Sequence, residues 1–520
     1  MSSNQTPIAI VGGGPCGLAT ALLLAQSQIP CVVFEKKLGL STHPKAMGIS
    51  RRSAEIFRQL GILEALYEPT RHLTDSPDAC LNIFARSFTG EEWGRIPLTE
   101  PVSPLSPGPS FHCPQTLTEQ VLFHALEQAA PGCVRFQHEV TSVTHADNSV
   151  EFRAGDERWT ADWLIAADGA GGQIRHELHV VSDGPGDMGH FLNVYLRAAY
   201  GPHLNGRRSL LFTVLSDDLV EVFVAVNGDD LWLMHHFLQP GEGPENYPAD
   251  KLAAQIRRAS GFPEIPVEVL SVSPWVMSPK VSRHFRRGRI LLVGDAAARM
   301  SPAGGLGLNT GLQSTHNLAW KLAAVVRGQA SPALLDTYEE ERHGAALWTL
   351  DHTNKNSVEV YAIIQAAVER DWPQVRELIS HNGRAGSRLG IDLGIEYPKG
   401  AVVADGTDPV PRNDPINDYP PNGRPGSRAP HFQLEDGRSV LDLFGKGFVF
   451  LAAETPPPES AKYRSQVMPR NSPFAATYGV DSGGGVLVRP DGYVAARWRN
   501  LPPTGAIEQT LANILWLDRA

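Results

Sequence analysis

The chain has 520 residues, 42% of them hydrophobic, and its 46 basic and 56 acidic residues give a formal net charge of −10. This length accommodates two or three domains with cores of their own, and the acidic balance argues against a nucleic-acid partner. No apolar run approaches the roughly 20 residues that cross a bilayer, and the polar start runs directly into an apolar strand. We therefore expect a cytoplasmic protein with no transmembrane segment and no signal peptide.

The first motif is a glycine-rich turn between an apolar strand at residues 8–11 and an apolar helical segment. Gly12 permits the tight turn, Gly14 lets the backbone approach a pyrophosphate, and Gly17 lets the helix pack closely on the strand. The helix N-terminus offers unpaired N–H groups to the anion. A second strand ends at Glu35, eighteen residues after Gly17, close to the spacing at which an acid binds ribose hydroxyls. This pattern predicts a dinucleotide site.

A second glycine-rich motif follows almost three hundred residues later. An apolar strand at residues 289–293 delivers Asp295 to its C-terminal end, where open α/β sheets bind ligands. The glycine-dense loop 301–311 then precedes an amphipathic helix at 312–326. Several backbone N–H groups at such a helix start suit the anionic edge of a reduced flavin. Together the two motifs indicate one FAD site.

At this point the chain resembles the class A FAD-dependent aromatic hydroxylases, and within them the phenol and polyketide hydroxylase branch. The three fingerprints of that family are Gly12-x-Gly14-x-x-Gly17, Asp168-Gly169 and Gly294-Asp295. The resemblance implies an α/β fold: a Rossmann-like FAD-binding domain of glutathione-reductase type, an inserted antiparallel β-sheet substrate domain and a C-terminal thioredoxin-like domain. It also implies that NADPH or NADH binds transiently and reduces FAD. O₂ then forms a flavin C4a-hydroperoxide, which hydroxylates a phenolic or polyketide aromatic substrate.

The resemblance and the punctuation of the chain divide it into five parts. These are an FAD-binding domain (1–180, with 75–110 contributing to the substrate region), a β-sheet substrate domain (181–280), a continued FAD-binding and helical segment (281–395), a linker (396–430) and a thioredoxin-like domain (431–520). A stretch with six prolines, 97–114, is interpreted as either a mobile cover over the active site or a solvent-exposed crossing.

Site residues are carried over motif by motif. Pro302, Gly305 and Leu308 are expected to position the flavin, and no general base is assigned. Two departures explain this: Ala298 stands where many relatives have histidine, and Met47 stands where phenol hydroxylase places an acid. The cofactor-binding residues that the resemblance implies are Gly12, Gly14, Gly17, Glu35, Lys36, Lys45, Gln115, Asp168, Asp295, Pro302, Gly307, Leu308 and Asn309. Arg175 fits the arginine that often follows the second fingerprint.

The segment 181–280 is rich in predicted strands, with a hairpin signal at residues 227–230. In the family this sheet roofs the substrate pocket. The candidates to line that pocket are Phe212, Phe223, Trp232, Met234, His235 and His236. Because the two histidines are adjacent, they point to opposite faces of a strand, and at most one of them faces the pocket.

Three alternatives remain open at this point. The same flavin hydroperoxide can instead insert oxygen beside a polyketide ketone in a Baeyer–Villiger reaction, or the chain can be a non-catalytic FAD-binding accessory protein. A flavin halogenase is disfavoured because the segment 93–97 lacks that family's second tryptophan. No cysteine follows Cys133, so the C-terminal domain cannot perform dithiol chemistry. No metal site is expected, and a homodimer is the family-based expectation.

Overall fold

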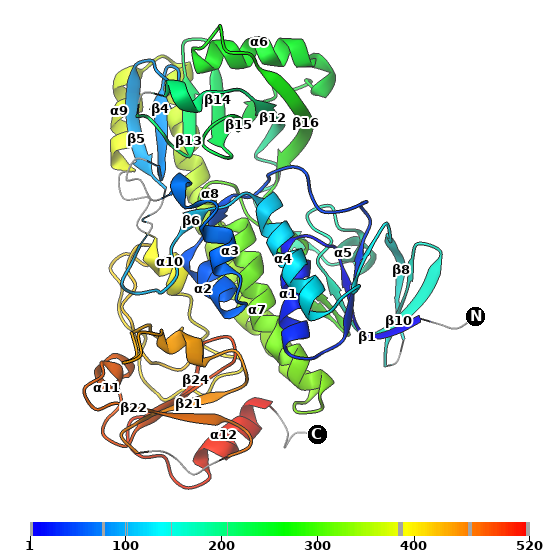
Figure 1. Cartoon of the computed structure of the whole chain (residues 1–520), viewed down its shortest axis with the longest axis vertical. Helices are drawn as coiled ribbons and strands as arrows, with labels where there is room; N and C mark the ends of the chain where they lie inside the picture. The colour runs from blue at the N-terminus through cyan, green and yellow to red at the C-terminus, as the bar shows by residue number, and fades with distance from the viewer. Residues whose placement is uncertain are drawn as a thin grey trace.

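The computed structural model describes residues 4–515 except 75–78, 99, 101, 147, 205, 383–387 and 456–459. Figure 1 shows three regions along the long axis of the molecule. A seven-stranded sheet lies at one end, a small four-stranded unit lies at the other, and a parallel sheet with its helices lies between them. Within these described residues, no helix is both long and apolar enough to span a membrane.

The central sheet has eight strands, and five consecutive strands of it run parallel. The strand β1 (Asn4–Val11) lies between β10 (Glu157–Ala166) and β2 (Cys31–Glu35). Residues 8–11 of β1 are buried, as a strand covered on both faces requires. The remaining strands are β7 (Val134–Phe136), β8 (Val140–His145), β9 (Val150–Ala154), β18 (Arg286–Arg287) and β19 (Ile290–Leu292).

Three helices pack together beside this sheet. The helix α1 (Pro15–Gln26) contacts both α4 (Gln115–Ala129) and α7 (Gly307–Val326). Shorter elements surround them: β3 (Gly48–Ile49), α2 (Arg51–Gln59), α3 (Leu63–Tyr67), β6 (Phe111–His112), α5 (Gln173–Glu177), β11 (Ser182–Asp183), β17 (Lys280–Ser282), β20 (Ala298–Arg299) and α10 (Leu389–Leu393).

The seven-stranded sheet is built mainly from the segment predicted to be β-rich. Its order is β16 (Glu268–Met277), β12 (Gly189–Arg197), β15 (Leu231–Phe237), β14 (Val220–Ala225), β13 (Leu211–Leu215), β4 (Leu81–Ala85) and β5 (Glu92–Pro97). The pairing is antiparallel except between β13 and β4. The helix α6 (Ala249–Ser260) covers one face with Leu252 and Ile256.

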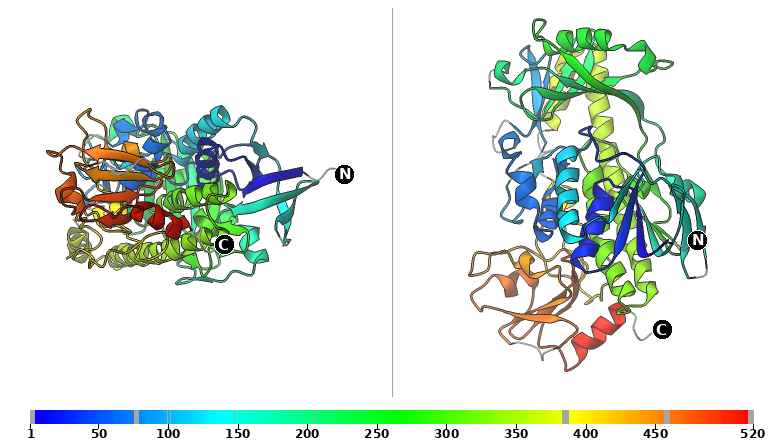
Figure 2. Two further views of the ribbon diagram at one scale, coloured as in Figure 1. Left: turned by 90° about the horizontal axis from the view of Figure 1, so that it is seen from below. Right: turned by 45° about the vertical axis from the view of Figure 1, so that its right-hand side comes forward.

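One helix connects the centre of the molecule with this sheet. The helix α8 (Asp336–Val368) has 33 residues, which corresponds to about 50 Å of helix axis. Figure 2 shows it as the long rod that reaches the seven-stranded sheet. Near its far end Ile363 packs with Phe84 and Trp93 of that sheet, beside α9 (Trp372–His381).

The C-terminal unit is a four-stranded sheet in the order β22 (Arg464–Met468), β21 (Val449–Ala453), β23 (Gly485–Val488) and β24 (Val494–Trp498). Its helices are α11 (Phe474–Tyr478) and α12 (Ala506–Leu515). A core on one side includes Phe450 and Trp320 of α7, so the unit packs directly on that helix. The predicted fold class is confirmed.

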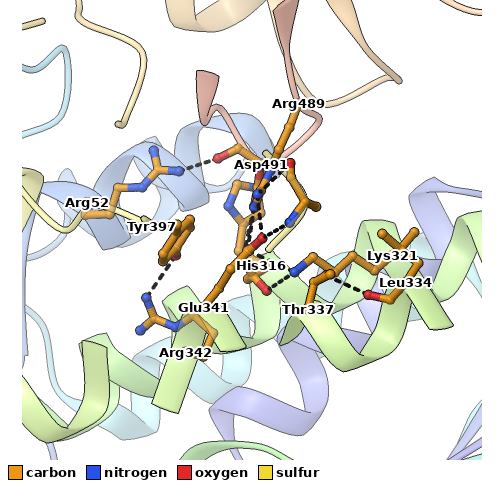
Figure 3. A network of polar contacts seen from close by, with 12 residues as sticks. Arg52, His316, Lys321, Leu334, Thr337, Glu341, Arg342, Tyr397, Arg489 and Asp491 are labelled. Carbon is orange, nitrogen blue, oxygen red and sulfur yellow. Dashed lines mark hydrogen bonds and ion pairs between the residues drawn. The ribbon is translucent and has the colours of Figure 1, made fainter. Parts of the chain in front are cut away.

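Buried charges reinforce this interface (Figure 3). The Glu341 carboxylate on α8 accepts hydrogen bonds from Arg489 of the C-terminal unit at 2.8 and 2.9 Å, and from Lys321 of α7 at 2.9 Å. All three side chains are fully buried. Burial alone would raise the pKa of Glu341, but the two cations outweigh it and hold the pKa at about 2. The network therefore joins α7, α8 and the C-terminal unit through ionised groups.

The second half of the proline-rich stretch is packed against the protein. Ser106 is buried and donates a hydrogen bond to Glu55 of α2 at 2.6 Å, and a Cβ placed on Gly108 would lie 2.8 Å from Ala54. The interpretation of this part as a solvent-exposed crossing is therefore wrong, because it lies against α2. Thr99 and Pro101 fall outside the described residues.

Candidate flavin and substrate site

The first glycine motif forms a tight turn whose three glycines meet different surroundings. Gly12 has φ +108°, and a Cβ there would lie 2.3 Å from the Ala167 carbonyl oxygen. A Cβ on Gly17 would lie 1.9 Å from the Gly12 carbonyl oxygen. A Cβ on Gly14, in contrast, would meet nothing within 4 Å. Gly12 and Gly17 thus serve backbone packing, and Gly14 borders open space at the start of α1.

The acid at the end of β2 is held in place by backbone donors. The Glu35 carboxylate accepts hydrogen bonds from the Gly13 N–H at 2.7 Å and from the Lys37 N–H at 2.9 Å. Its position at the carboxyl end of β2 is the one predicted for a ribose ligand. Lys36 is largely exposed, with its ammonium 3.9 Å from Glu139.

The loop that contains Lys45 is fastened to the start of α4. The Gln115 side chain accepts from the Ala46 N–H at 3.3 Å and donates to Glu119 at 2.7 Å. Glu119 accepts from the Ser41 N–H at 2.8 Å. Residues 37–43 and 45 line a cavity of about 290 Å³. Gln115 therefore shapes this loop in addition to any contact with a cofactor.

Arg175 connects the second and third fingerprints. Its guanidinium donates to the carbonyl oxygens of Ala296 and Ala170, at 3.2 and 3.1 Å. Arg299, which the sequence analysis did not single out, donates to the same Ala170 carbonyl at 3.1 Å. The only indication of this role in the sequence is that Arg299 is a basic residue four positions after Asp295. These two arginines therefore hold the second and third fingerprints next to each other.

The two acids of these fingerprints lie in cation-rich surroundings. Asp295 has an exposed side chain, yet the enclosing protein raises its pKa, while Arg299, Lys45 and Arg175 act in the opposite direction. Burial also raises the pKa of Asp168, whose Oδ2 accepts from the Ile174 N–H at 3.2 Å. The other oxygen, Oδ1, is buried with no partner among the described residues. Both acids can therefore accept further hydrogen bonds.

The start of α7 is the second open helix end. Among the described residues no side chain caps α7, which begins at Gly307 after the N-cap Leu306. Gly305 has φ +64° and a Cβ there would meet nothing within 4 Å, and Pro302 is exposed beside it. The backbone N–H groups of Leu308 and its neighbours in the first turn lie beyond the reach of i−4 helix bonds. This end is suited to an anionic edge of a ligand.

Asn309 fixes this helix end to the neighbouring loop. Its Oδ1 accepts from the Ser50 N–H at 2.9 Å, and its Nδ2 donates to the carbonyl oxygens of Gly48 at 2.9 Å and Gly305 at 2.6 Å. All of its side-chain polar atoms are thus engaged within the protein. Only the backbone of Asn309 is available to a cofactor, as expected from the sequence.

These features fit a dinucleotide flavin. Two helix N-termini, α1 and α7, lack side-chain caps among the described residues and border open space at Gly14 and Gly305. Helix N-termini bind phosphate and other anions, and an acid at the end of the second strand suits a ribose. Fold and site together define an FAD-binding oxidoreductase of the Rossmann class.

Comparison with known proteins agrees with this class. The FAD binding domain family matches residues 5–353, and the family described as aromatic-ring hydroxylase, C-terminal, matches residues 422–520. The chain is 31% identical to a putative polyketide hydroxylase of Streptomyces halstedii, over 98% of this chain and 97% of that one. It is also 31% identical to the 4-methyl-5-nitrocatechol 5-monooxygenase of a Burkholderia species, over 98% of each.

Solved structures give the same result. The flavin-dependent monooxygenase PieE, in complex with FAD and substrate, has a TM-score of 0.90 at 28% identity, covering 99% of this chain and 100% of that one. A ternary complex of aklavinone-11 hydroxylase with FAD and aklavinone has a TM-score of 0.84 at 27% identity, with the same coverage. The chain belongs to the FAD-dependent aromatic hydroxylases of the phenol and polyketide hydroxylase branch. It is an FAD-dependent monooxygenase.

The structure corrects the predicted substrate face for five of the six candidates. They lie on the face of the sheet that α6 covers, where Phe212, Phe223 and Trp232 contact the Phe88 ring, and not over the flavin site. His236, the polar member of this group, has a partner on that face, since its Nδ1 lies 2.9 Å from the Glu221 carboxylate. The five residues are Phe212, Phe223, Trp232, Met234 and His236.

His235 is the one candidate on the opposite face. It is paired across the sheet with Asn193 of β12. On the same face Met47 packs against Val224 and Leu233, and the His43 ring lies 5.8 Å from the Tyr195 ring. Because residues 43 and 47 belong to the loop that leads to the Asn309 contacts, this is the face turned toward the flavin site. The sequence did not predict which face this is, because the alternation of a strand does not say which set of alternate side chains faces the site.

Proposed function

We propose that this monooxygenase uses NADPH or NADH and O₂ to hydroxylate a phenolic or polyketide aromatic small molecule. When bound, FAD supplies the redox chemistry, accepting a hydride from the nicotinamide and activating O₂. The names of relatives support the substrate class: a tetracenomycin A2 monooxygenase-dioxygenase of Streptomyces glaucescens is 31% identical, and aklavinone 12-hydroxylase DnrF of Streptomyces peucetius is also 31% identical.

The observation that carries the proposal is the placement of an aromatic sheet face beside the loop that contacts the open start of α7. On β12 and β16, Phe191 and Trp275 stack at 4.5 Å with an interplanar angle of 14°, and Tyr195 continues the same face toward His43. Aromatic side chains stabilise a planar ligand through large contact area and ring stacking. Such a wall, opposite a flavin, suits an aromatic substrate.

The protein's own residues would hold the flavin at defined points. The N–H groups at the start of α1 would bind the pyrophosphate, Glu35 the ribose, and the first turn of α7 the pyrimidine edge of the ring. Asp295 would accept hydrogen bonds from the ribityl and pyrophosphate region. Pro302 and Gly305 would set the distance of the loop from the ring.

The test is turnover of the holoenzyme with NADPH, ¹⁸O₂ and candidate phenols, followed by mass spectrometry. Label in a new hydroxyl group supports hydroxylation. Label inside a lactone or ester indicates Baeyer–Villiger insertion instead. Oxidation of NADPH that yields only hydrogen peroxide with every aromatic compound contradicts the proposal and favours an accessory role.

The reductant is tested separately by anaerobic reduction of the bound flavin with NADPH and with NADH. No second glycine fingerprint is present in the sequence for the nicotinamide, so we expect transient binding beside the flavin. A homodimer and a cytoplasmic location stay predictions. Light scattering of the purified holoenzyme measures the first.

A further inference from the structure

The flavin-facing side of the seven-stranded sheet contains a group of buried polar atoms that have no hydrogen-bond partner in the described part of the chain. They are Asn193 Oδ1, His235 Nδ1, Trp275 Nε1 and both ring nitrogens of His43. An unsatisfied buried polar group costs free energy, so native structures rarely leave one without a reason. Here several lie on one surface.

The register of the sheet places three of these residues side by side. Asn193 pairs with His235 of β15 on one side and with Ser273 of β16 on the other. Trp275 is two residues after Ser273 on the same face, and its ring lies 6.1 Å from the His235 ring in an edge-to-face arrangement. We call Asn193, His235 and Trp275 the polar edge. It shares Trp275 with the aromatic face described above.

The chemistry of the polar edge restricts its ligand. An indole N–H donates only, so Trp275 requires an acceptor such as a carbonyl oxygen. The amide oxygen of Asn193 accepts only, so it requires a donor such as a hydroxyl group. The neutral imidazole of His235 can do either at Nδ1. A ligand that satisfies all three must present at least one acceptor and one donor, and a carbonyl oxygen together with a hydroxyl group meets this requirement.

This face also lacks a free positive charge. Among the described residues of β12 to β15, the one basic side chain on it is Arg197, which is ion-paired with Glu268 at 2.9 Å and with Asp230 at 3.4 Å. Burial lowers the pKa of His235 to about 4 and also lowers the pKa of His43. Both imidazoles are therefore neutral near pH 7. A carboxylate on the ligand would find no countercharge on this face of the sheet, and burying an unpaired charge is costly.

We propose that Asn193, His235 and Trp275 recognise the substrate, and that it is an uncharged aromatic compound that carries both a carbonyl oxygen and a hydroxyl group. This inference rests on the proposed function, because it assumes that the flavin-facing surface binds the substrate. It narrows the substrate class from aromatic compounds in general to hydroxyquinones and hydroxyaryl ketones.

The first experiment compares four probes on the oxidised holoenzyme by titration of flavin fluorescence. They are 1,8-dihydroxyanthraquinone, its dimethyl ether, anthraquinone and anthraquinone-2-carboxylate. We expect the dihydroxy compound to bind at least tenfold more tightly than each of the others, because a site built for hydrogen bonds rejects analogues that leave its groups unpaired. Equal affinities, preference for the carboxylate, or binding of none of the four overturns the proposal.

The second experiment uses His235→Leu and Asn193→Leu. Each is expected to lower the affinity for the dihydroxy compound at least tenfold while changing the affinity for anthraquinone less than threefold. His190→Gln is the matched control, because His190 is an exposed histidine of β12 on the opposite face. It should bind all four probes as the parent does. Loss of affinity for dihydroxy compound and anthraquinone alike would overturn specific recognition.

The two levels of proposal fail in different ways. The titration needs neither NADPH nor O₂. Selective binding without any oxygenated product would therefore contradict the proposed reaction but support substrate recognition by the polar edge. Oxygenated product from aromatic compounds, combined with unselective binding, would contradict recognition by the polar edge and not the proposed reaction. His235→Gln, which keeps a polar side chain, should retain part of the selectivity if the leucine variant does not fold.

Discussion

The three glycines of the first motif differ in what a side chain would meet, and this separates cofactor binding from folding. Gly17 is in contact with the Gly12 carbonyl, so any side chain there collides with backbone. Gly14 is extended, with φ −77° and ψ −179°, and faces open space. A side chain at Gly14 is therefore compatible with the protein and incompatible with a pyrophosphate.

We predict that Gly14→Val folds but binds FAD at least tenfold more weakly, because its side chain occupies the place of the phosphates. Gly17→Ala should fail to fold, because its Cβ would overlap the backbone. Gly344→Ala, whose Cβ meets nothing within 4 Å on α8, is the control: it should bind FAD as the parent does and melt no lower, because alanine favours a helix interior over glycine. The measurements are the flavin-to-protein ratio and the melting temperature. Full FAD content in Gly14→Val would contradict the placement of the phosphates.

Buried histidines predict how stability depends on pH. Burial lowers the pKa of His112 to about 4 and that of His316 to about 3, with Arg52 adding to the effect at His316. In the unfolded chain both titrate near 6.5, so the unfolded state takes up protons first as the pH falls. Their contribution to stability is complete above pH 6.5 and is lost as the pH falls toward 4 and 3.

We therefore expect the free energy of unfolding to fall below pH 6.5, with a limiting slope of about 1.4 kcal/mol per pH unit for each of the two histidines. His316→Gln should be less stable at pH 7.5, since it loses the 3.1 Å contact with Gln59, but should show a shallower decline between pH 6.5 and 4.5. Unfolding in urea across this range measures it. Parallel pH profiles for variant and parent would show that His316 is not involved.

At the scale of elements, Asn309 joins the start of α7 to β3 and α2. Its side chain makes three hydrogen bonds to the backbone of residues 48–50 and 305. Loops that approach a cofactor closely depend on such contacts for their position, because a small displacement changes every hydrogen bond to the ligand. We therefore expect Asn309 to be a positioning residue for the flavin, and not a direct ligand through its side chain.

Asn309→Ala should lower FAD affinity about tenfold and shift the absorbance maxima of the bound flavin, since helix and loop lose their connection. The matched control is Gln313→Met, one turn further along α7, where the side-chain oxygen has no partner among the described residues. It should keep the parent's spectrum. Unchanged flavin affinity and spectrum in Asn309→Ala would contradict the positioning role.

The sequence predicted most strands of the seven-stranded sheet, but not which face of that sheet turns toward the flavin site. The strands β12 to β15 lie within the ranges expected from β-rich segments and the hairpin signal, because turn chemistry and alternation are local. Which set of alternate side chains faces the flavin site depends on α6 and on the loop containing Met47, which come from other parts of the chain. The same applies to Arg299, whose role depends on a carbonyl 129 residues away.

At the scale of the whole molecule, the C-terminal unit is part of the flavin domain's support. Its Arg489 meets Glu341 of α8 and its Asp491 carbonyl accepts a hydrogen bond from Arg52 of α2 at 2.5 Å (Figure 3). A lone charge left in such an interface is expensive, because burial has removed its water. The unit has no cysteine, which leaves structural support as its expected role.

Arg489→Met should destabilise the holoenzyme by about 3–5 kcal/mol, because it leaves Glu341 with a single buried cation. Glu341→Gln should do the same for Arg489 and Lys321. The double variant should cost much less than the sum of the two, since the groups share one network. Urea unfolding of the four proteins completes the cycle. Additive costs would show that the two residues act independently.

The long helix α8 has a further consequence for the molecule. Glu341 meets the C-terminal unit, Asn356 donates to the Ala303 carbonyl of the flavin loop at 3.4 Å, and Ile363 packs under the seven-stranded sheet. One rigid rod thus sets both spacing and rotational phase among three regions. A single inserted residue would turn everything beyond it by about 100° and advance it by about 1.5 Å. The chain's tolerance of length changes is therefore uneven: surface turns can absorb them, whereas α8 between Glu341 and Ile363 cannot.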